Sequence, residues 1–195
     1  MRQAIEKRMT NETQIEILLN LDGSGQTDIH TGIGFFEHML KQIAVHGLFD
    51  VSIKAIGDLD VDSHHTIEDV GLLLGQAFDK ALGDRKGIVR IAQAFVPMDD
   101  SLCAVFVDLS GRPYHVFNGT WNGENVGHMP VSMIEHFFYS LSMTMKANLH
   151  FSIEYGRNNH HKAEALYKAL GRALMQASRI DPKRENNIPS SKGVL

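Results

Sequence analysis

The chain has 195 residues, 43% of them hydrophobic, which is enough to bury a substantial core and argues against intrinsic disorder. Its formal net charge of −4 provides no overall basic field, so we expect no general affinity for nucleic acid or for an anionic membrane. The single Cys103 cannot form an internal disulfide, the charged start of the chain does not suit a signal peptide, and no apolar stretch is long enough to span a membrane, so we expect a cytoplasmic protein.

Hydrophobic patterns predict the same succession of elements twice along the chain. The first half is expected to contain a strand at 14–19, a helix at about 33–47, a strand at 51–56 and a helix at about 64–83. The second half is expected to contain a strand at 101–107, a helix at about 130–146, a strand at 149–155 and a helix at about 160–178. Strands in runs with helices on one face favour an α+β fold over a doubly wound one.

Two motifs also recur, which indicates an internal duplication. The pair Glu37-His38 returns as Glu135-His136, and the motif His64-His65-x-x-Glu68 returns as His160-His161-x-x-Glu164, 96 residues further along (164 − 68 = 96). We therefore expect two sheet-and-helix halves, at about 1–85 and 86–180, packed by pseudo-two-fold symmetry into a single unit. Residues 181–195 form a C-terminal tail.

The repeated motif has the spacing of a metal site. On a helix, residues three and four apart share a face, so Glu68 lies beside both His64 and His65. Adjacent helical residues diverge by roughly 100°, so one histidine pair can serve two sites. Together with His38 and His136, the duplication supplies six imidazoles and two carboxylates, which divide into two ions with three His and one Glu each.

Metal identity stays open at this point, because Mn²⁺ is plausible while Fe²⁺, Co²⁺ or Zn²⁺ would bind the same ligands. Lone histidines such as His46, His128 and His150 are interpreted as packed or solvated residues. The zinc-protease motif H-E-x-x-H is absent from the sequence, which disfavours a protease.

Four segments resemble the imidazoleglycerol-phosphate dehydratase family, and the similarity extends from about Arg8 to Lys192. These segments are Gly32-Ile33-Gly34-Phe35-Phe36-Glu37-His38-Met39-Leu40, Asp62-Ser63-His64-His65-Thr66-Ile67-Glu68-Asp69, Asp108-Leu109-Ser110-Gly111-Arg112-Pro113 and the run 156–174. The resemblance implies a duplicated fold like the second domain of ribosomal protein S5. It also implies a lyase with two Mn²⁺ per active site that converts imidazoleglycerol phosphate to imidazoleacetol phosphate and water in histidine biosynthesis.

The resemblance further implies a homo-oligomer of 24 subunits built from trimers, with active sites at subunit contacts, and it assigns roles to individual residues. The metal ligands would be His38, His64, His65, Glu68, His136, His160, His161 and Glu164. Glu12 would be a substrate-site carboxylate, and Arg90, Arg112, Lys168, Ser190, Ser191 and Lys192 would bind the phosphate. Ser190-Ser191 stands where many relatives have Ser-Thr, which keeps the hydroxyl. The tail is expected to order over bound substrate.

The chemistry explains why such residues are needed. The hydrogen to be removed is not activated by a carbonyl, so a metal-bound imidazolate is expected to expel hydroxide through a diazafulvene-like intermediate. A carboxylate then takes the carbon-bound proton, and Glu12 and Glu164 are both candidates. Asp108 could orient the substrate, although an acid before Ser-Gly is more typical of a turn.

Three other functions compete with this one. A two-metal hydrolase would also place metals near a phosphate, but it would favour aspartate-rich ligands. A metal-storage protein would not need separate basic phosphate positions. An RNA-binding module of the same fold would need a basic stripe, which this chain lacks.

Overall fold

The computed structural model describes residues 2–184 and 187–195 of the chain. The first half contains β1 (Gln3–Met9), β2 (Thr13–Asn20), β3 (Thr27–His30), α1 (Gly34–Gly47), β4 (Asp50–Gly57) and α2 (His64–Leu82). The second half contains β5 (Ile91–Met98), β6 (Ser101–Asp108), β7 (Tyr114–Asn118), β8 (Asn125–Val126), β9 (Met129–Pro130), α3 (Val131–Met145), β10 (Asn148–Tyr155) and α4 (Asn159–Ser178).

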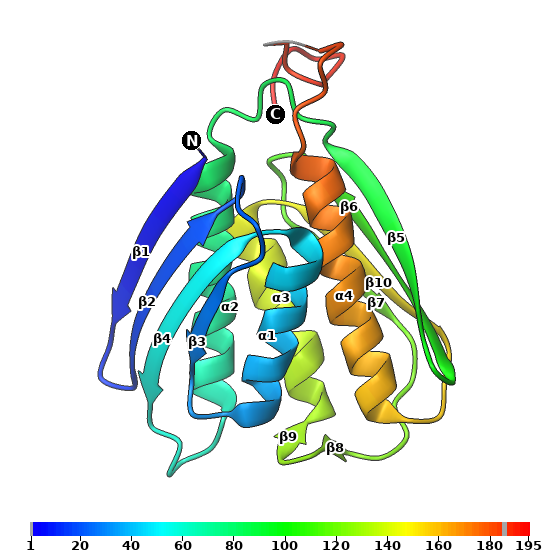
Figure 1. The fold of residues 1–195 in the computed structure, drawn as a ribbon. Coiled ribbons are helices and arrows are strands. Elements are labelled where there is room, and N and C mark those ends of the chain that lie inside the picture. The colour runs from blue at the N-terminus through cyan, green and yellow to red at the C-terminus, as the bar shows by residue number, and fades with distance from the viewer. Residues whose placement is uncertain (1, 185–186) are drawn as a thin grey trace.

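Each half builds a four-stranded sheet with the same topology. The strand orders are β1-β2-β4-β3 and β5-β6-β10-β7, with two antiparallel pairings followed by one parallel pairing at the last strand. The two sheets form the outer layers, and the four helices fill the space between them (Figure 1). Alternation in β2 sends Ile15, Ile17 and Leu19 toward the helices, where they join one continuous apolar core.

The structure confirms the expected α+β fold with two similar halves. All eight expected elements are present with ends within a few residues. Strands β1, β3, β5 and β7 were not predicted, and neither was the small β8–β9 ribbon. In β1, the inward residues include Glu6 and Arg8, so its apolar alternation is weak. Among the described residues, no helix is both long and apolar enough to cross a membrane.

Close helix crossings join the halves. Helix α2 packs on α3, and α1 packs on α4, so each contact pairs a helix of one half with a helix of the other. At Gly171 on α4, an added Cβ would lie 2.6 Å from the carbonyl oxygen of Ile43 on α1. At Gly75 on α2, it would lie 2.6 Å from the carbonyl oxygen of Leu141 on α3. Only glycine permits such close contact between backbones at these two positions.

Candidate metal centre

Two side-chain clusters lie near the N-terminal ends of the helices. Polar residues before the helices fix where the histidine pairs begin. The Asn158 side chain accepts hydrogen bonds from the backbone N–H groups of His160 and His161, and Asp62 accepts one from His64. Each histidine pair therefore starts its helix, with the glutamate one turn later.

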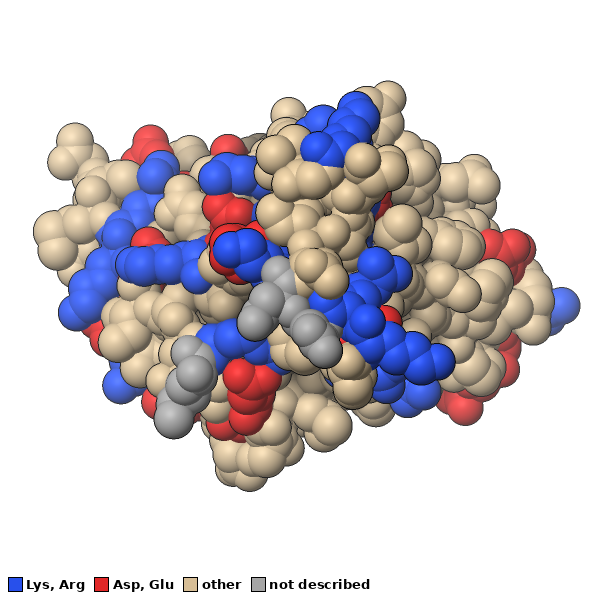
Figure 2. Space-filling view, turned by 90° about the horizontal axis from the view of Figure 1, so that it is seen from above, with Lys and Arg blue, Asp and Glu red and all other residues tan. Residues whose placement is uncertain are grey.

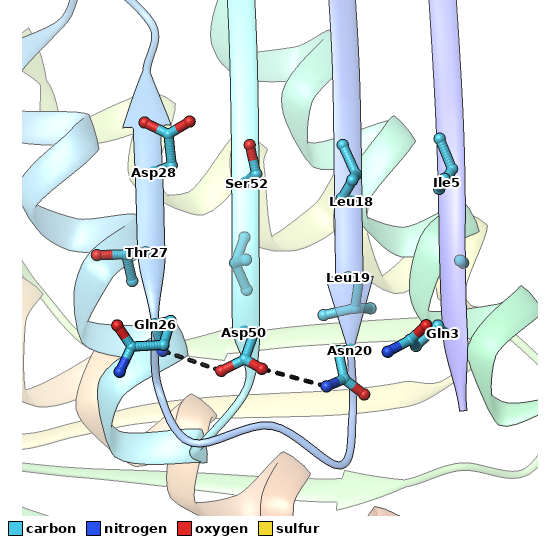
Figure 3. Close-up of a pocket in the computed structure, with 12 residues that line it drawn as sticks. Gln3, Ile5, Leu18, Leu19, Asn20, Gln26, Thr27, Asp28, Asp50 and Ser52 are labelled. Atoms are coloured by element: carbon cyan, nitrogen blue, oxygen red, sulfur yellow. Dashed lines mark hydrogen bonds between the residues drawn. The ribbon is translucent and has the colours of Figure 1, made fainter. Parts of the chain in front are cut away.

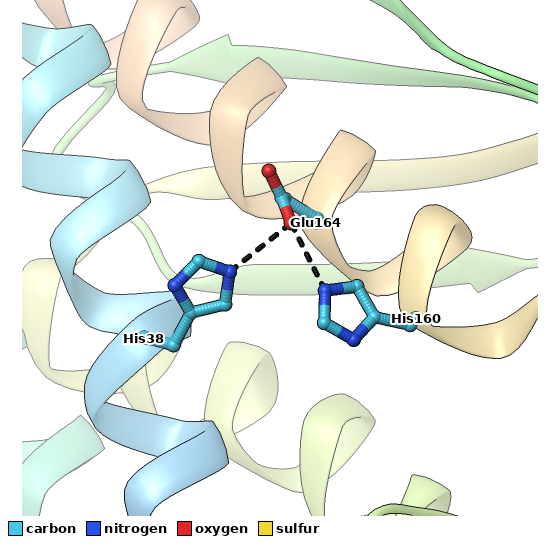
Figure 4. A group of neighbouring side chains, drawn as sticks. All are labelled: His38, His160 and Glu164. Atoms are coloured by element: carbon cyan, nitrogen blue, oxygen red, sulfur yellow. Dashed lines mark hydrogen bonds and ion pairs between the residues drawn. The ribbon is translucent and has the colours of Figure 1, made fainter.

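The first cluster, here called the α4 cluster, consists of His38, His160 and Glu164. His38 points from α1, and the other two point from α4, toward one another (Figure 4). The Oε2 atom of Glu164 lies 3.1 Å from Nε2 of His38 and 3.1 Å from Nε2 of His160. The ring of Phe35 packs edge-on against His160, with centroids 5.3 Å apart. This cluster holds a nearly buried carboxylate between two imidazoles.

The second cluster, here called the α2 cluster, repeats this arrangement with His64, Glu68 and His136. The Oε2 atom of Glu68 lies 3.2 Å from Nε2 of His64 and 3.1 Å from Nε2 of His136, which comes from α3. Each cluster thus takes two ligands from one half and a single histidine from the other. In both, the candidate ligand atoms lie within 4.8 Å of one another.

The donor sets fit divalent metal ions. Imidazole and carboxylate together suit several first-row transition metals. The Nε2 atom of His136 is buried without a hydrogen-bond partner of good geometry, although it faces Glu68. A buried polar atom of this kind is costly unless something binds it, and a metal ion would do so.

A cation distinguishes the two clusters. The ammonium of Lys168 lies 2.6 Å from Oε1 of Glu164, one helical turn along α4. Burial alone would raise the pKa of Glu164, but hydrogen bonds from Lys168 and His38 outweigh it and lower this pKa to about 2. Glu164 is therefore an anion at neutral pH. Leu72 occupies the position in the first half that corresponds to Lys168, so the α2 cluster has no equivalent ammonium group.

The remaining histidines of the two pairs lie outside the clusters. His65 and His161 point toward the turns that connect β1 to β2 and β5 to β6. The Nε2 atom of His65 lies 3.9 Å from a carboxylate oxygen of Glu12. The structure thus brings together six of the eight predicted ligands in two trios and leaves these two imidazoles apart.

The predicted phosphate-binding residues are dispersed. Lys168 is the one that lies beside a cluster. The backbone N–H of Arg90 donates to the carbonyl oxygen of Ala177 at the end of α4, and its side chain contacts Pro189 of the tail. Figure 1 shows the C-terminus at this end of the molecule, where the helices end. The 20 residues of α4 separate the two ends, and a helix of that length spans about 30 Å. Within one chain, these residues cannot reach the clusters.

The described end of the C-terminal tail, residues 187–195, packs on the region around Arg90. The guanidinium binds both carboxylate oxygens of Asp108, at 2.7 and 3.1 Å, and donates to the carbonyl oxygen of Pro189 at 2.8 Å. Gly111 lies against Leu195, close enough that an added Cβ would be 2.7 Å from its carbonyl carbon. Figure 2 views this end of the molecule and shows several Lys and Arg side chains there among acidic ones.

A separate groove lies on the outer face of the first sheet. It has a volume of about 420 Å³ and is lined by residues such as Ile5, Leu18, Asp28 and Ser52 (Figure 3). None of the predicted site residues lines it. The groove is therefore separate from the candidate metal site.

Sequence reasoning missed two aspartates that contact the histidine pairs. Asp58 hydrogen-bonds to His65, and Asp100 hydrogen-bonds to His161. An acid after a strand or in a hairpin is ordinarily a turn former, so neither position carried a signal.

The chain is similar over most of its length to proteins of one enzyme family. A family model described as imidazoleglycerol-phosphate dehydratase matches residues 31–174. The chain is 56% identical over 194 residues to the imidazoleglycerol-phosphate dehydratase of a Roseiflexus species, covering 100% of this chain and 98% of that relative. It is 52% identical over 188 residues to that of Alkaliphilus metalliredigens, covering 96% of each.

Two solved structures of the same enzyme share the fold. The imidazoleglycerol-phosphate dehydratase of Staphylococcus aureus has a TM-score of 0.84 and 34% identity, covering 92% of this chain and 99% of that one. The enzyme of Pyrococcus furiosus has a TM-score of 0.83 and 32% identity, covering 97% of this chain and 100% of that one.

Proposed function

Because the chain belongs to the imidazoleglycerol-phosphate dehydratase family, we propose that its two clusters each hold one divalent metal ion, with Mn²⁺ as the ion used. The reaction follows from the family: the chain is a hydro-lyase that removes water from imidazoleglycerol phosphate in histidine biosynthesis. Family membership decides against the hydrolase, storage and RNA-binding alternatives. We also propose a cytoplasmic location, in keeping with the unpaired Cys103.

The bound ions would supply Lewis-acid character and a template for the imidazole ring of the substrate. The two clusters would hold them through His38, His160 and Glu164, and through His64, Glu68 and His136. The observation that carries this proposal is the recurrence of the same His-His-Glu geometry in both halves, each completed across the halves by one histidine.

We assign the remaining ligands to neighbouring copies of the chain. Each cluster has two imidazoles and one carboxylate, whereas a shell of three His and one Glu requires one imidazole more. His65 and His161 face away from the clusters of their own chain. They would therefore complete the centres of other subunits, which supports an active site at a subunit contact and the trimer-based assembly of 24 subunits.

The positions of the phosphate residues support the same assembly. Arg90, Arg112, Ser190, Ser191 and Lys192 belong to the end of the chain remote from its clusters. Arg90 uses three of its five N–H donors on Asp108 and Pro189, which leaves two for a phosphate. We propose that this end binds the phosphate of a substrate whose imidazole lies at another subunit's clusters, with the tail 181–195 as part of that site.

Glu12 is the better of the two candidate bases. Oxygen Oε2 of Glu164 faces two imidazoles, oxygen Oε1 faces Lys168, and its low pKa makes the carboxylate a weak proton acceptor. The Glu12 carboxylate is 56% exposed and, among the described residues, takes part in no side-chain hydrogen bond. We propose that Glu12 accepts the carbon-bound proton after hydroxide has left.

Metal-dependent turnover tests this proposal. The purified protein is treated with a chelator, and formation of the enolisable ketone from imidazoleglycerol phosphate is followed with and without added Mn²⁺. Loss of turnover and its restoration by Mn²⁺ are expected. Full turnover in protein shown to be metal-free would overturn the proposed role of the clusters.

A further inference from the structure

The two histidines left outside the clusters share one feature. The Nδ1 atom of His65 lies 3.0 and 3.2 Å from the two carboxylate oxygens of Asp58. The Nδ1 atom of His161 lies 2.5 Å from Oδ1 of Asp100. In both cases the aspartate contacts Nδ1, the ring nitrogen nearer the backbone, and leaves Nε2 to other partners.

The two aspartates come from positions that the duplication does not relate. Asp58 directly follows β4, and the residue that directly follows the corresponding strand β10 is Gly156. Asp100 precedes β6 in a hairpin, and the residue before the corresponding strand β2 is Glu12. The two halves therefore reach the same contact from different parts of the fold, which a shared ancestry of the halves does not explain.

A carboxylate at Nδ1 determines what the other ring nitrogen can do. It accepts a hydrogen bond from Nδ1–H, which fixes that tautomer and leaves the Nε2 lone pair free to bind a metal ion. Metal-binding histidines commonly have such a partner on the second nitrogen, which also fixes the orientation of the ring.

Asp100 is itself held in place. Its Oδ2 atom accepts hydrogen bonds from the backbone N–H groups of Arg157, at 2.6 Å, and Asn158, at 3.1 Å. At the other ring nitrogen, the exposed Asp99 carboxylate lies 3.3 Å from Nε2 of His161, and Glu12 lies 3.9 Å from Nε2 of His65. Each imidazole therefore has one acid at Nδ1 and a second acid near Nε2.

We propose that Asp58 and Asp100 are positioning residues, which hold His65 and His161 with the Nε2 lone pair directed at a metal ion of a neighbouring subunit. This inference rests on the proposed function. It also gives different roles to Asp100 and Glu12, the acids that directly precede β6 and β2. Asp100 orients His161, whereas His65 is oriented by Asp58, so that Glu12 remains available for proton transfer.

The test measures metal affinity and not turnover. Mn²⁺ is titrated into the metal-depleted, assembled protein, and free Mn²⁺ is quantified by electron paramagnetic resonance. Asp58→Ala and Asp100→Ala are each expected to weaken Mn²⁺ binding by about 10- to 100-fold. Asp58→Asn and Asp100→Asn keep an acceptor oxygen for Nδ1–H and are expected to recover much of that loss.

Asp28→Ala provides the matched control. It breaks an Asp–His contact of 3.0 Å with His30 on β3, away from both clusters, and is expected to leave Mn²⁺ affinity unchanged. The melting temperature of each metal-free variant is measured alongside, because a purely structural role would lower it.

The outcomes distinguish failure of the positioning role from failure of the proposed function. The positioning role would be overturned if both alanine variants kept the Mn²⁺ affinity of the unaltered protein. It would also be overturned if the loss of Mn²⁺ affinity were matched by a parallel fall in the melting temperature of the metal-free variants. If the unaltered protein bound no Mn²⁺, the proposed function itself would fail.

Discussion

The Nε2 atom of His38 lies 3.1 Å from Oε2 of Glu164, although 126 residues separate them along the chain. The contact joins α1 of the first half to α4 of the second, and the His136–Glu68 contact joins α3 to α2 in the same way. Each candidate metal site therefore depends on the packing of both halves. A displacement at either helix crossing would separate ligands that neither half can supply alone.

We expect that position 171, where α4 crosses α1, cannot accommodate any residue larger than glycine. Gly171→Ala would place a methyl group against the backbone of α1 and should destabilise the protein by about 1–3 kcal/mol, because that backbone cannot yield as a flexible side chain can. Mn²⁺ affinity should fall as well, since His38 moves with α1. Thermal unfolding and Mn²⁺ titration check both effects. Gly34→Ala, which has open space around the added Cβ, is the control, and equal stability of the two variants would contradict the argument.

The sequence predicts eight candidate ligands but not which of them meet. Helical periodicity predicts that each His-His pair shares a face with the glutamate that follows it, and the recurrence of the Glu-His pair adds His38 and His136. The sequence could not decide which imidazole meets which carboxylate, since that depends on the glycine crossings at Gly75 and Gly171. Three edge strands were missed because β1 is charged and β3 and β7 are short, and such strands acquire their pattern from the sheet that they join. In β5, apolar residues lie on both faces, with Ala92 inward and Phe95 exposed, so hydrophobic alternation does not mark it.

Replacement of the proposed base should separate chemistry from metal binding. Glu12→Gln is expected to lower kcat by about 10²- to 10⁴-fold, the usual contribution of a positioned general base, and to leave the Mn²⁺ stoichiometry unchanged. Glu164→Gln should instead lose Mn²⁺ from the α4 cluster. Steady-state kinetics and metal analysis distinguish these results. A Glu12→Gln enzyme with kcat within a few-fold of the unaltered one would exclude Glu12 as the base.

Substitution of a predicted phosphate-binding residue should weaken substrate binding more than it slows the chemical step. Arg90→Leu removes a guanidinium with two free donors, and a lost charged hydrogen bond of about 1.5–3 kcal/mol corresponds to a fall in kcat/KM of roughly 10- to 100-fold. Most of the change should appear in KM. Arg184→Leu removes an exposed guanidinium paired with Asp181 near the same tail and serves as the control. Similar kinetics for both variants would count against the assignment of Arg90.

A half-buried histidine that is not a cluster ligand, His115, should make stability depend on pH. Burial, with a smaller effect of His150, lowers the pKa of His115 to about 4. An unfolded histidine titrates near pH 6.5, so between about pH 6.5 and 4 the unfolded chain binds a proton that the folded chain does not. Stability should therefore fall as the pH decreases through this window.

His115→Phe should remove that contribution, because the ring already packs beside Phe151 and Tyr139 and phenylalanine cannot titrate. Melting temperatures of the metal-free protein at several pH values measure the effect. The exposed His128→Gln variant controls for the loss of a histidine in general. A His115→Phe protein that loses stability over the same window as the unaltered one would show that another group is responsible.

If each metal centre combines a cluster of one chain with an imidazole of another, two variants that are defective in different parts of the centre should complement each other in mixed particles. One variant carries His65→Ala with His161→Ala, so its clusters are intact but it donates no imidazole. The other carries Glu68→Gln with Glu164→Gln, so it donates imidazoles but has defective clusters. Each alone is expected to be inactive. Co-assembled particles should regain a clear fraction of dehydratase activity, because clusters of the first variant then meet imidazoles of the second, whereas mixed particles as inactive as either parent would show that each centre is built within a single chain.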